Sequence, residues 1–364
     1  MQKIISGIQQ IGVGIPNVHE AWDWYLKNFN MDIPAFDAEG WAELMLPYTG
    51  NKPQERHAIL ALNMKGGGGF EIWQYKSRTP EKANFEIKLG DLGIFAVKIK
   101  TADIEKTYNK FKEDNLQIIG EIKKDANNKK FFFVKDLYGN VFQMVENNMW
   151  FSTNEALTGG VEGAIIGVTD IEKSIRFYSE ILDYNEVLYD TNGKFDDLTA
   201  LSGGTDTFRR ALITHKEPRK GAFNKLFGNS TIELVQVTSR KAEKIFKDRF
   251  WGDLGFIHLC FDIGGMDIFR EQCKTFGHPF TVDSRRPNGT EAEVFDMGEA
   301  SGDFAYIEDP DGTLIELVEA HRIPLVKKIG WELNLNKRDR AKALPNWMVK
   351  MLSLKRVKEV KISK

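Results

Sequence analysis

The clearest pattern of apolar and polar positions lies in residues 304–320, FAYIEDPDGTLIELVEA. An apolar run enters an Asp-Pro-Asp-Gly turn, in which Pro310 presets one backbone angle and Gly312 permits the positive φ that such a turn needs. The second apolar run has Glu316 in its middle, on the same face as two apolar neighbours because side chains alternate along a strand. An acid in that position is costly unless it is paired, hydrogen-bonded or bound to a metal. Glu316 is therefore the first candidate functional residue.

The same order of patterns occurs four times along the chain. Each copy has a short apolar strand, a helix with aromatic residues on one face and several further strands, so one supersecondary unit is used repeatedly. The copies are predicted at residues 7–76, 90–148, 160–240 and 252–321. Asn17 and Asp170 stand just before the helices of the first and third copies, where their side-chain oxygens can cap the first free N–H groups.

Composition describes an ordinary globular chain. Hydrophobic residues make up 42% and charged residues 28% of its 364 residues, a length that suggests at least two domains. The net charge of −2 gives no general argument for nucleic acid or a membrane surface. Cys260 and Cys273 form no CxxC motif and suit a reducing compartment. No run resembles a signal peptide or a membrane span, so we expect a cytoplasmic protein.

Charge is unevenly distributed, because residues 322–364 contain 13 Lys and Arg against 3 Asp and Glu. A basic tail of this kind can bind nucleic acid or anionic lipid. Its apolar residues, among them Leu344, Met348 and Leu352, favour packing against protein instead. We predict that the tail lies on the acidic body of its own chain or on a second subunit, in which case the protein is a homodimer.

The repeated unit resembles that of the vicinal oxygen chelate superfamily, which includes glyoxalase I, bleomycin-resistance proteins and extradiol ring-cleaving dioxygenases. The runs DIEKSIRFYSEIL and EDPDGTLIELVE carry the resemblance, which covers residues 7–321. It implies an α+β fold in which four βαβββ modules pair into two half-open β-barrels, modules one with two and three with four. The implied domains are residues 1–150 and 151–321, followed by the basic C-terminal extension 322–364.

The resemblance also implies a divalent metal, whose ligands in this superfamily lie on the first and last strands of paired modules. The matching positions in the second barrel are Gly163, Glu233, His258 and Glu316. Those in the first barrel are Gln10, Glu71, Ile94 and Gln143. One imidazole and two carboxylates suit Zn, Ni, Co, Mn or Fe(II), so His258, Glu316 and Glu233 are the predicted metal ligands. Either acid can serve as the catalytic base, and the first barrel is expected to be metal-free.

Other polar residues have less specific interpretations. Arg209 and Arg210 could bind a substrate carboxylate or form a solvated pair at a strand edge. His258 alone could be a core histidine, and Glu233 a partly solvated strand acid. His215 follows a strand and could be a fourth ligand, although a surface position is favoured. The remaining histidines have no partner spacing and are expected in solvent or loops: His19, His57, His278 and His321.

The predicted function is that of a metal-dependent, glyoxalase-like lyase or isomerase, acting through an enediolate on a small substrate with vicinal oxygens. An extradiol dioxygenase that uses Fe(II) is the alternative, although a single histidine among the matching positions counts against it. A non-catalytic small-molecule-binding protein of the resistance type is a third interpretation. Metal content distinguishes the binding protein from the enzymes, and oxygen uptake distinguishes the two enzymes. We expect no nucleic-acid or membrane partner.

Overall fold

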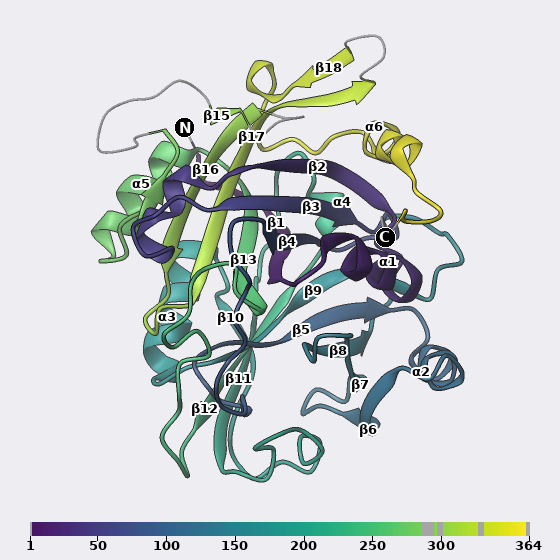
Figure 1. Cartoon of the computed structure of the whole chain (residues 1–364), viewed down its shortest axis with the longest axis vertical. Coiled ribbons are helices and arrows are strands. Elements are labelled where there is room, and N and C mark those ends of the chain that lie inside the picture. Colours follow the sequence, from purple (N-terminus) through teal and green to yellow (C-terminus); the bar gives the residue numbers. More distant parts are fainter. Residues whose placement is uncertain (1, 286–294, 297–300, 327–330, 362–364) are drawn as a thin grey trace.

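Four repeated modules make up the protein (Figure 1). The computed structural model describes residues 2–285, 295–296, 301–326 and 331–361. Each module opens with a long strand that leads into a helix, as the hydrophobic pattern predicts. The opening strands are β1 (Ile4–Gly14), β5 (Gly93–Thr101), β9 (Thr158–Gly167) and β13 (Gly255–Gly264). The helices are α1 (Val18–Phe29), α2 (Ile104–Glu113), α3 (Ile171–Leu182) and α5 (Met266–Thr275).

Further strands complete each module. In the first two modules they are β2 (Ile33–Trp41), β3 (Glu55–Leu62), β4 (Gly69–Tyr75), β6 (Gln117–Lys124), β7 (Lys130–Lys135) and β8 (Val141–Glu146). In the last two they are β10 (Glu186–Gly193), β11 (Phe208–Thr214), β12 (Thr231–Val237), β14 (Val282–Asp283), β15 (Phe295–Asp296), β16 (Ser301–Glu308) and β17 (Leu314–Val326). The remaining elements are η1 (Glu43–Tyr48), α4 (Asn224–Phe227), β18 (Trp331–Asn334), η4 (Leu335–Lys337), α6 (Asn346–Lys350) and η5 (Met351–Lys355).

Side chains fix where the module helices begin. Asn17 and Asp170 cap α1 and α3 as expected, because their side-chain oxygens accept hydrogen bonds from first-turn N–H groups. Helix α5 differs, since it begins after Gly265, which has no side chain to cap it. The carboxylate of Glu319 on β17 accepts hydrogen bonds from the N–H groups of Gly265 and Met266 at 3.0 and 2.8 Å. A strand of the same module thus supplies this cap.

The modules pair differently from the expected order. The first sheet, which forms the first barrel of the structure from modules one and four, has the strand order β14-β16-β17-β13-β1-β4-β3-β2, with β15 beside β16 and β18 beside β17. The second sheet, which forms the second barrel from modules two and three, has the order β10-β11-β12-β9-β5-β8-β7-β6. The antiparallel pair β1–β13 joins module one to module four, and β5–β9 joins module two to module three. The predicted pairing of one with two and three with four is therefore wrong. All four opening strands are apolar and can pair with one another, so local patterns do not specify the partner.

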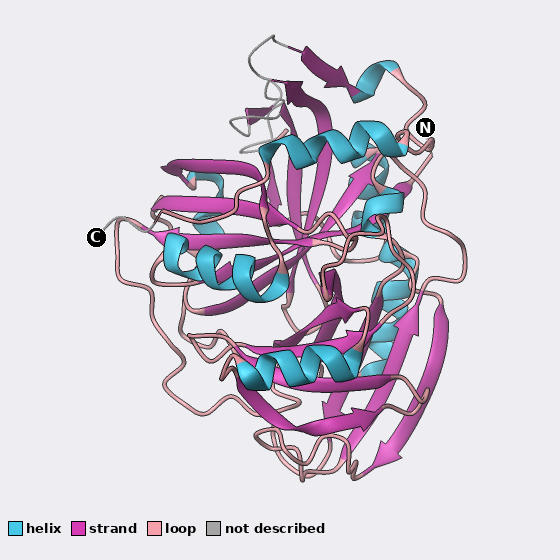
Figure 2. Ribbon diagram, turned by 90° about the vertical axis from the view of Figure 1, so that its right-hand side faces the viewer, coloured by secondary structure: helices cyan, strands magenta, loops and turns pink. Residues whose placement is uncertain are grey.

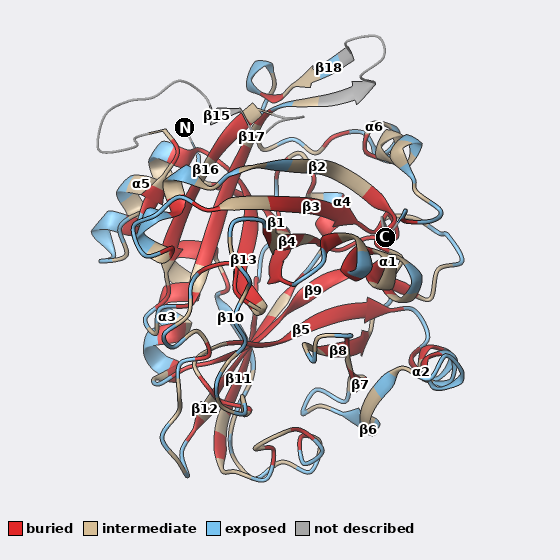
Figure 3. Ribbon diagram, in the orientation of Figure 1, coloured by how far each residue is buried: buried red, intermediate tan, exposed pale blue. Residues whose placement is uncertain are grey.

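Two half-open barrels of this α+β fold are confirmed, and they lie one above the other (Figures 1 and 2). One apolar core joins them, formed by the outer faces of both sheets and the helices that cover them. Phe142 on β8 contacts Phe29 on α1 and Phe256 on β13, with ring centroids 4.9 and 5.3 Å apart. Buried residues accordingly concentrate along the central strands (Figure 3). The two sheets thus share one hydrophobic core.

The inner faces of the two barrels differ. Side chains fill the interior of the second barrel, where Phe95, Phe131 and Phe133 pack against Leu198 and Leu201 from the segment between β10 and β11. The first barrel keeps an open cavity of about 430 Å³. Since ligands bind in concave, partly apolar spaces, the first barrel is the place to look for a functional site.

The described part of the basic tail packs on the first sheet of its own chain. Leu344 and Val349 are buried in an apolar cluster with residues of β2 and β3. Further along, the N–H of Val357 donates to the carbonyl of Asp32 at 2.9 Å, and Arg356 forms an ion pair with the Asp32 carboxylate. A homodimer stays a prediction. Within the described residues, no helix has the length and apolar character needed to cross a membrane.

Candidate metal centre

Four polar side chains converge inside the first barrel, one from each of its four central strands. They are Gln10 on β1, Glu71 on β4, His258 on β13 and Glu316 on β17. His258 Nε2 lies 3.2 Å from Glu71 Oε2 and 3.1 Å from Glu316 Oε2. The Gln10 amide donates to the same two oxygens at 3.3 Å each. Each carboxylate oxygen therefore lies between the amide and the imidazole.

Strand register explains this convergence. Gly12 on β1 is paired with His258 on one side and with Glu71 on the other. A Cβ atom at position 12 would lie only 2.3 Å from Cε1 of His258. Glycine therefore leaves the space that the imidazole occupies. The imidazole is also held by aromatic neighbours, since the Trp251 ring lies parallel to it at 6.2 Å and the Tyr306 ring meets it edge-on at 5.5 Å.

The centre carries buried negative charge. His258 is fully buried, and Gln10 and Glu316 are 4% and 7% exposed. Burial alone would lower the pKa of His258, but Glu316 and Glu71 raise this pKa to about 9. Burial favours the neutral form of Glu316, whereas His258 holds the pKa of this carboxyl below its usual value. Two carboxylates thus face one imidazole in a region of low dielectric, where a cation is strongly favoured.

The donor set fits a divalent transition metal. His258 Nδ1 and the Oε1 atom of Gln10 are buried without a hydrogen-bond partner among the described residues, which is unusual for buried polar atoms. A metal would be bound by an imidazole nitrogen, two carboxylate oxygens and, after the amide turns, Gln10 Oε1. Nitrogen and oxygen donors of these types suit Zn, Ni, Co, Mn and Fe(II).

The cavity opens over this centre, and three of the four converging residues line it: Gln10, Glu71 and Glu316. Its remaining walls are mostly apolar and aromatic. They include Phe36, Leu60, Trp73, Phe223, Trp251 and Phe304. Arg56 and Lys355 also reach the cavity, the latter from the basic tail. The space can therefore hold an apolar molecule whose polar end meets the four converging side chains.

Glu233, the third predicted ligand, does not lie with His258 and Glu316. It belongs to β12 in the second sheet and is buried inside the second barrel. Its carboxylate accepts hydrogen bonds from Lys98 at 2.9 Å and from Arg210 at 2.6 and 2.9 Å. Burial alone would raise the pKa of Glu233, but these two cations lower it to about 2. Two side-chain cations thus stand where a metal was expected.

The register of the second sheet identifies the counterparts of the four converging residues. Glu233 corresponds to Glu71 because each acid, in its own sheet, is paired with the equivalent residue of the neighbouring opening strand, β9 for Glu233 and β1 for Glu71. By the same reasoning the counterparts of Gln10, His258 and Glu316 are Gly163, Ala96 and Gln143. Ala96, rather than the expected Ile94, takes the place of the histidine. Among the four counterparts only Glu233 is a strong ligand.

Neither predicted substrate-binding arginine lines the cavity of the first barrel. Both lie on β11 in the second sheet. Arg209 forms ion pairs at 2.6 Å with Asp190 and with Glu172. Arg210 is almost fully buried and is shared between Glu233 and Asp197. Both guanidinium groups therefore have carboxylate partners within the chain.

The other histidines also have defined surroundings. His215 is buried, and its Nδ1 lies 2.9 Å from the Glu217 carbonyl. Burial lowers the pKa of His215 to about 4. His278 Nδ1 lies 3.0 Å from the Glu308 carbonyl. His57 and His321 are buried on β3 and β17, so the expectation of solvent or loop positions is wrong for these two. The surface position favoured for His215 is wrong as well.

Gln10 and Glu71 were assigned to a metal-free barrel because the wrong modules were paired. Both stood among the positions that match superfamily ligands. Gly163 indicates that this pairing is wrong, because glycine offers no ligand side chain and the predicted set of metal ligands therefore lacks a donor at one position. Pairing module one with module four instead gives a donor at all four positions.

Comparisons with known proteins agree with this fold. The model of the Glyoxalase/Bleomycin resistance protein/Dioxygenase superfamily matches residues 7–144 and 161–317. No curated protein matches the sequence. The structure is similar to glyoxalase I from Zea mays, with 13% identity, a TM-score of 0.51, and coverage of 87% of this chain and 92% of that one.

A putative dioxygenase from Bacillus subtilis subsp. subtilis str. 168 is similar to the same degree. Its identity is 12% and its TM-score 0.53, with coverage of 87% of this chain and 86% of that one. Identities this low show a common fold and do not specify the activity. The family match covers most of the chain and confirms the resemblance on which the sequence prediction was based. The chain belongs to the Glyoxalase/Bleomycin resistance protein/Dioxygenase superfamily.

Proposed function

We propose that the protein is a metal-dependent lyase or isomerase of the glyoxalase type, with its active site in the first barrel. The observation that carries the proposal is the meeting of an imidazole, an amide and two carboxylates, with neighbouring polar atoms 3.1–3.3 Å apart, at the base of an open cavity. The proposed metal ligands are Gln10, Glu71, His258 and Glu316. Glu316 and His258 keep their predicted roles, and Glu71 takes the role predicted for Glu233.

A divalent ion bound here would supply Lewis-acid chemistry, by polarising two neighbouring oxygens of the substrate. Glu71 and Glu316 come from the outer two of the four strands, β4 and β17, and both reach the cavity. A carbon atom placed between them is within reach of either carboxylate. One carboxylate removes the proton from this carbon and, as the carboxylic acid, returns it to the adjacent carbon, while the hydroxyl proton of the substrate passes to the neighbouring oxygen; this is general acid–base catalysis.

The walls of the cavity indicate the kind of substrate. At about 430 Å³ the cavity holds more than the reacting carbons, and most of its lining is apolar. We therefore propose a substrate with vicinal oxygens at one end and a bulky apolar group at the other. The hemithioacetal of an aromatic α-oxoaldehyde has this form.

Metal analysis combined with kinetics tests the proposal. The protein is stripped with a chelator, reloaded with zinc, nickel or cobalt, and analysed beside His258→Ala and Glu71→Gln. We expect each variant to bind one ion fewer than the wild type, and to isomerise the hemithioacetal of phenylglyoxal at least about 100-fold more slowly. Glu43→Gln is the matched control, since Glu43 lines the cavity but lies outside the four-residue centre.

Three outcomes would contradict the proposal. Full metal content and full activity in both variants would place the metal elsewhere. Oxygen uptake with a catechol after loading with Fe(II), without isomerisation, would favour the dioxygenase. Small-molecule binding that is unaffected by metal and by both substitutions would favour a non-catalytic binding protein.

A further inference from the structure

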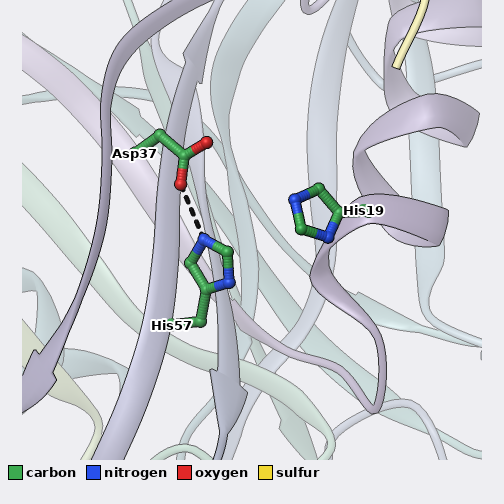
Figure 4. Close-up of side chains that lie close together, drawn as sticks. All are labelled: His19, Asp37 and His57. Atoms are coloured by element: carbon green, nitrogen blue, oxygen red, sulfur yellow. Dashed lines mark hydrogen bonds and ion pairs between the residues drawn. The ribbon is translucent and has the colours of Figure 1, made fainter. Parts of the chain in front are cut away.

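A second group of metal-ligating side chains lies on the other side of the first sheet, between α1 and two strands, the edge strand β2 and its neighbour β3. It consists of His19 on α1, Asp37 on β2 and His57 on β3 (Figure 4). One ligand atom from each lies within 4.8 Å of the other two. On β3 the neighbouring residue Arg56 lines the cavity, so the alternation of side chains directs His57 to the opposite face. The group is therefore separate from the proposed active site.

Both nitrogens of His57 face carboxylates. Nε2 lies 2.6 Å from Asp37 Oδ1, and Nδ1 lies 3.4 Å from Glu39 Oε1. Glu39 is in turn 3.1 Å from the Lys76 ammonium, whose hydrogen bond lowers the pKa of this carboxyl. Histidines that bind metals commonly do so with one nitrogen while a carboxylate holds the N–H of the other. Glu39 is in position to orient His57 in this way.

His19 completes the group from the helix side. Its ring meets the His57 ring edge-on, with centroids 5.2 Å apart, and Figure 4 shows the two rings and the Asp37 carboxylate around a common space. Within the described residues, no hydrogen bond from the His19 ring is found. Asn17 caps α1 and thereby fixes the turn that carries His19. Two imidazoles and a carboxylate thus converge from three separate elements.

An ion pair between His57 and Asp37, without a metal, explains only part of this arrangement. Asp37 is about half exposed, with 47% of its side chain accessible, and solvent weakens an ion pair that has an exposed partner. Such a pair also leaves the position of His19 unexplained. We propose that His19, Asp37 and His57 bind a divalent transition-metal ion of the zinc class, with Glu39 holding His57 in orientation. Imidazole and carboxylate donors favour Zn, Co, Ni and Cu over Mg and Ca.

Binding an ion requires the side chains to adjust. Ligands of a tetrahedral zinc lie about 3.3 Å apart for metal–ligand distances of about 2.0–2.1 Å, so the contact between His57 and Asp37 must open by roughly 0.7 Å, and separations from His19, which are within 4.8 Å, must close by up to about 1.5 Å. Asp37 is exposed enough to move this far, and water can take the remaining position. The ion would link the first turn of α1 to strands β2 and β3. These two strands also form one wall of the cavity on their other face.

Metal stoichiometry in combined variants tests the inference. Untagged, chelator-stripped protein is titrated with Co²⁺ and with Zn²⁺, and the ions per chain are measured after gel filtration. In the His258→Ala background we expect one ion per chain to remain, and to be lost on adding His19→Ala or His57→Ala. Glu39→Ala should weaken zinc binding by about 10- to 100-fold. If the barrel centre binds no ion, His258→Ala will equal the wild type while His19→Ala still loses its ion, so the two proposals fail separately.

Two controls keep the test decisive. Glu55→Gln changes an acid two residues from His57 on the same strand and should leave the stoichiometry unchanged. His57 is buried, so its loss can also weaken the fold. The partly exposed His19 avoids this problem, and added Zn²⁺ should raise the melting temperature of His258→Ala but not that of His258→Ala/His19→Ala. Equal ion counts and equal melting shifts in these two proteins would overturn the inference.

Discussion

Replacing Gly12 by alanine tests whether the imidazole of His258 is held where a metal needs it. The new Cβ would lie 2.3 Å from Cε1, 2.6 Å from Nδ1 and 2.7 Å from Nε2 of His258. Ordinary contacts of this kind are 3.4–4 Å, so the ring must move by roughly 1 Å, against the adjoining rings of Trp251 and Tyr306. Overpacking of this size costs about 1–3 kcal/mol of stability. Metal–ligand distances tolerate only about ±0.2 Å, so the displaced ring should leave the ligand set.

The assay for Gly12→Ala is zinc affinity by competition with a chromophoric chelator, measured together with thermal unfolding. We expect the affinity of the barrel centre to fall to that of His258→Ala, with a lower melting temperature. Gly40→Ala is the matched control, because a Cβ at this position on β2 meets nothing within 4 Å. A Gly12→Ala protein with wild-type zinc affinity and melting temperature would refute the reasoning. A variant that loses stability but keeps its zinc would remove His258 from the ligand set.

Three further predictions concern buried charges. Glu233→Gln leaves Lys98 buried without its acid and Arg210 with Asp197 alone, so thermal or urea unfolding should show a loss of about 3–5 kcal/mol with unchanged metal content; loss of an ion would contradict the assignment of this barrel. The folded-state pKa of Glu233, about 2, is below its ordinary 4.5, so its contribution is complete above pH 4.5 and lost as pH falls toward 2. In urea titrations between pH 7 and 3, the free energy of unfolding should therefore decline less steeply with falling pH for Glu233→Gln than for the wild type. Parallel declines in the two proteins would count against this ion pair. Burial raises the pKa of Asp262 from 3.8 to about 7, so its ionisation opposes folding increasingly as pH rises from 3.8 to 7. The free energy of unfolding of Asp262→Asn should therefore exceed that of the wild type by on the order of 2–4 kcal/mol at pH 8 and by almost nothing below pH 4. A difference between the two proteins that does not change with pH would show that ionisation is not the cause.

Local features of the fold were predictable because their causes are local. The four opening strands and their helices follow from apolar alternation and from side-chain caps such as Asn17 and Asp170. Glu316 was identified because an acid among apolar strand residues needs a partner. The cap of α5 was not predictable in this way, since it comes from Glu319, more than 50 residues further along the chain.

The complete candidate site depended on which modules pair, and local patterns do not contain this information. Gln10 and His258 lie on neighbouring strands only because β1 adds to the edge of β13, and any apolar opening strand has such an edge. The cluster of His19, Asp37 and His57 was missed for a related reason. Its members lie on a helix and two strands, so no single hydrophobic period relates them.

The pairing of the first module with the last has a consequence for how the chain folds. Modules two and three are adjacent in sequence, so their sheet can close as soon as both have left the ribosome. Strand β1 is synthesised before the other module strands, whereas its partner β13 is synthesised only after modules two and three. Until then one edge of β1 remains unpaired, which exposes it to wrong partners, and such distant contacts slow folding. We therefore expect the second sheet to form first, and the proposed metal centre to be complete only after β17 has been synthesised.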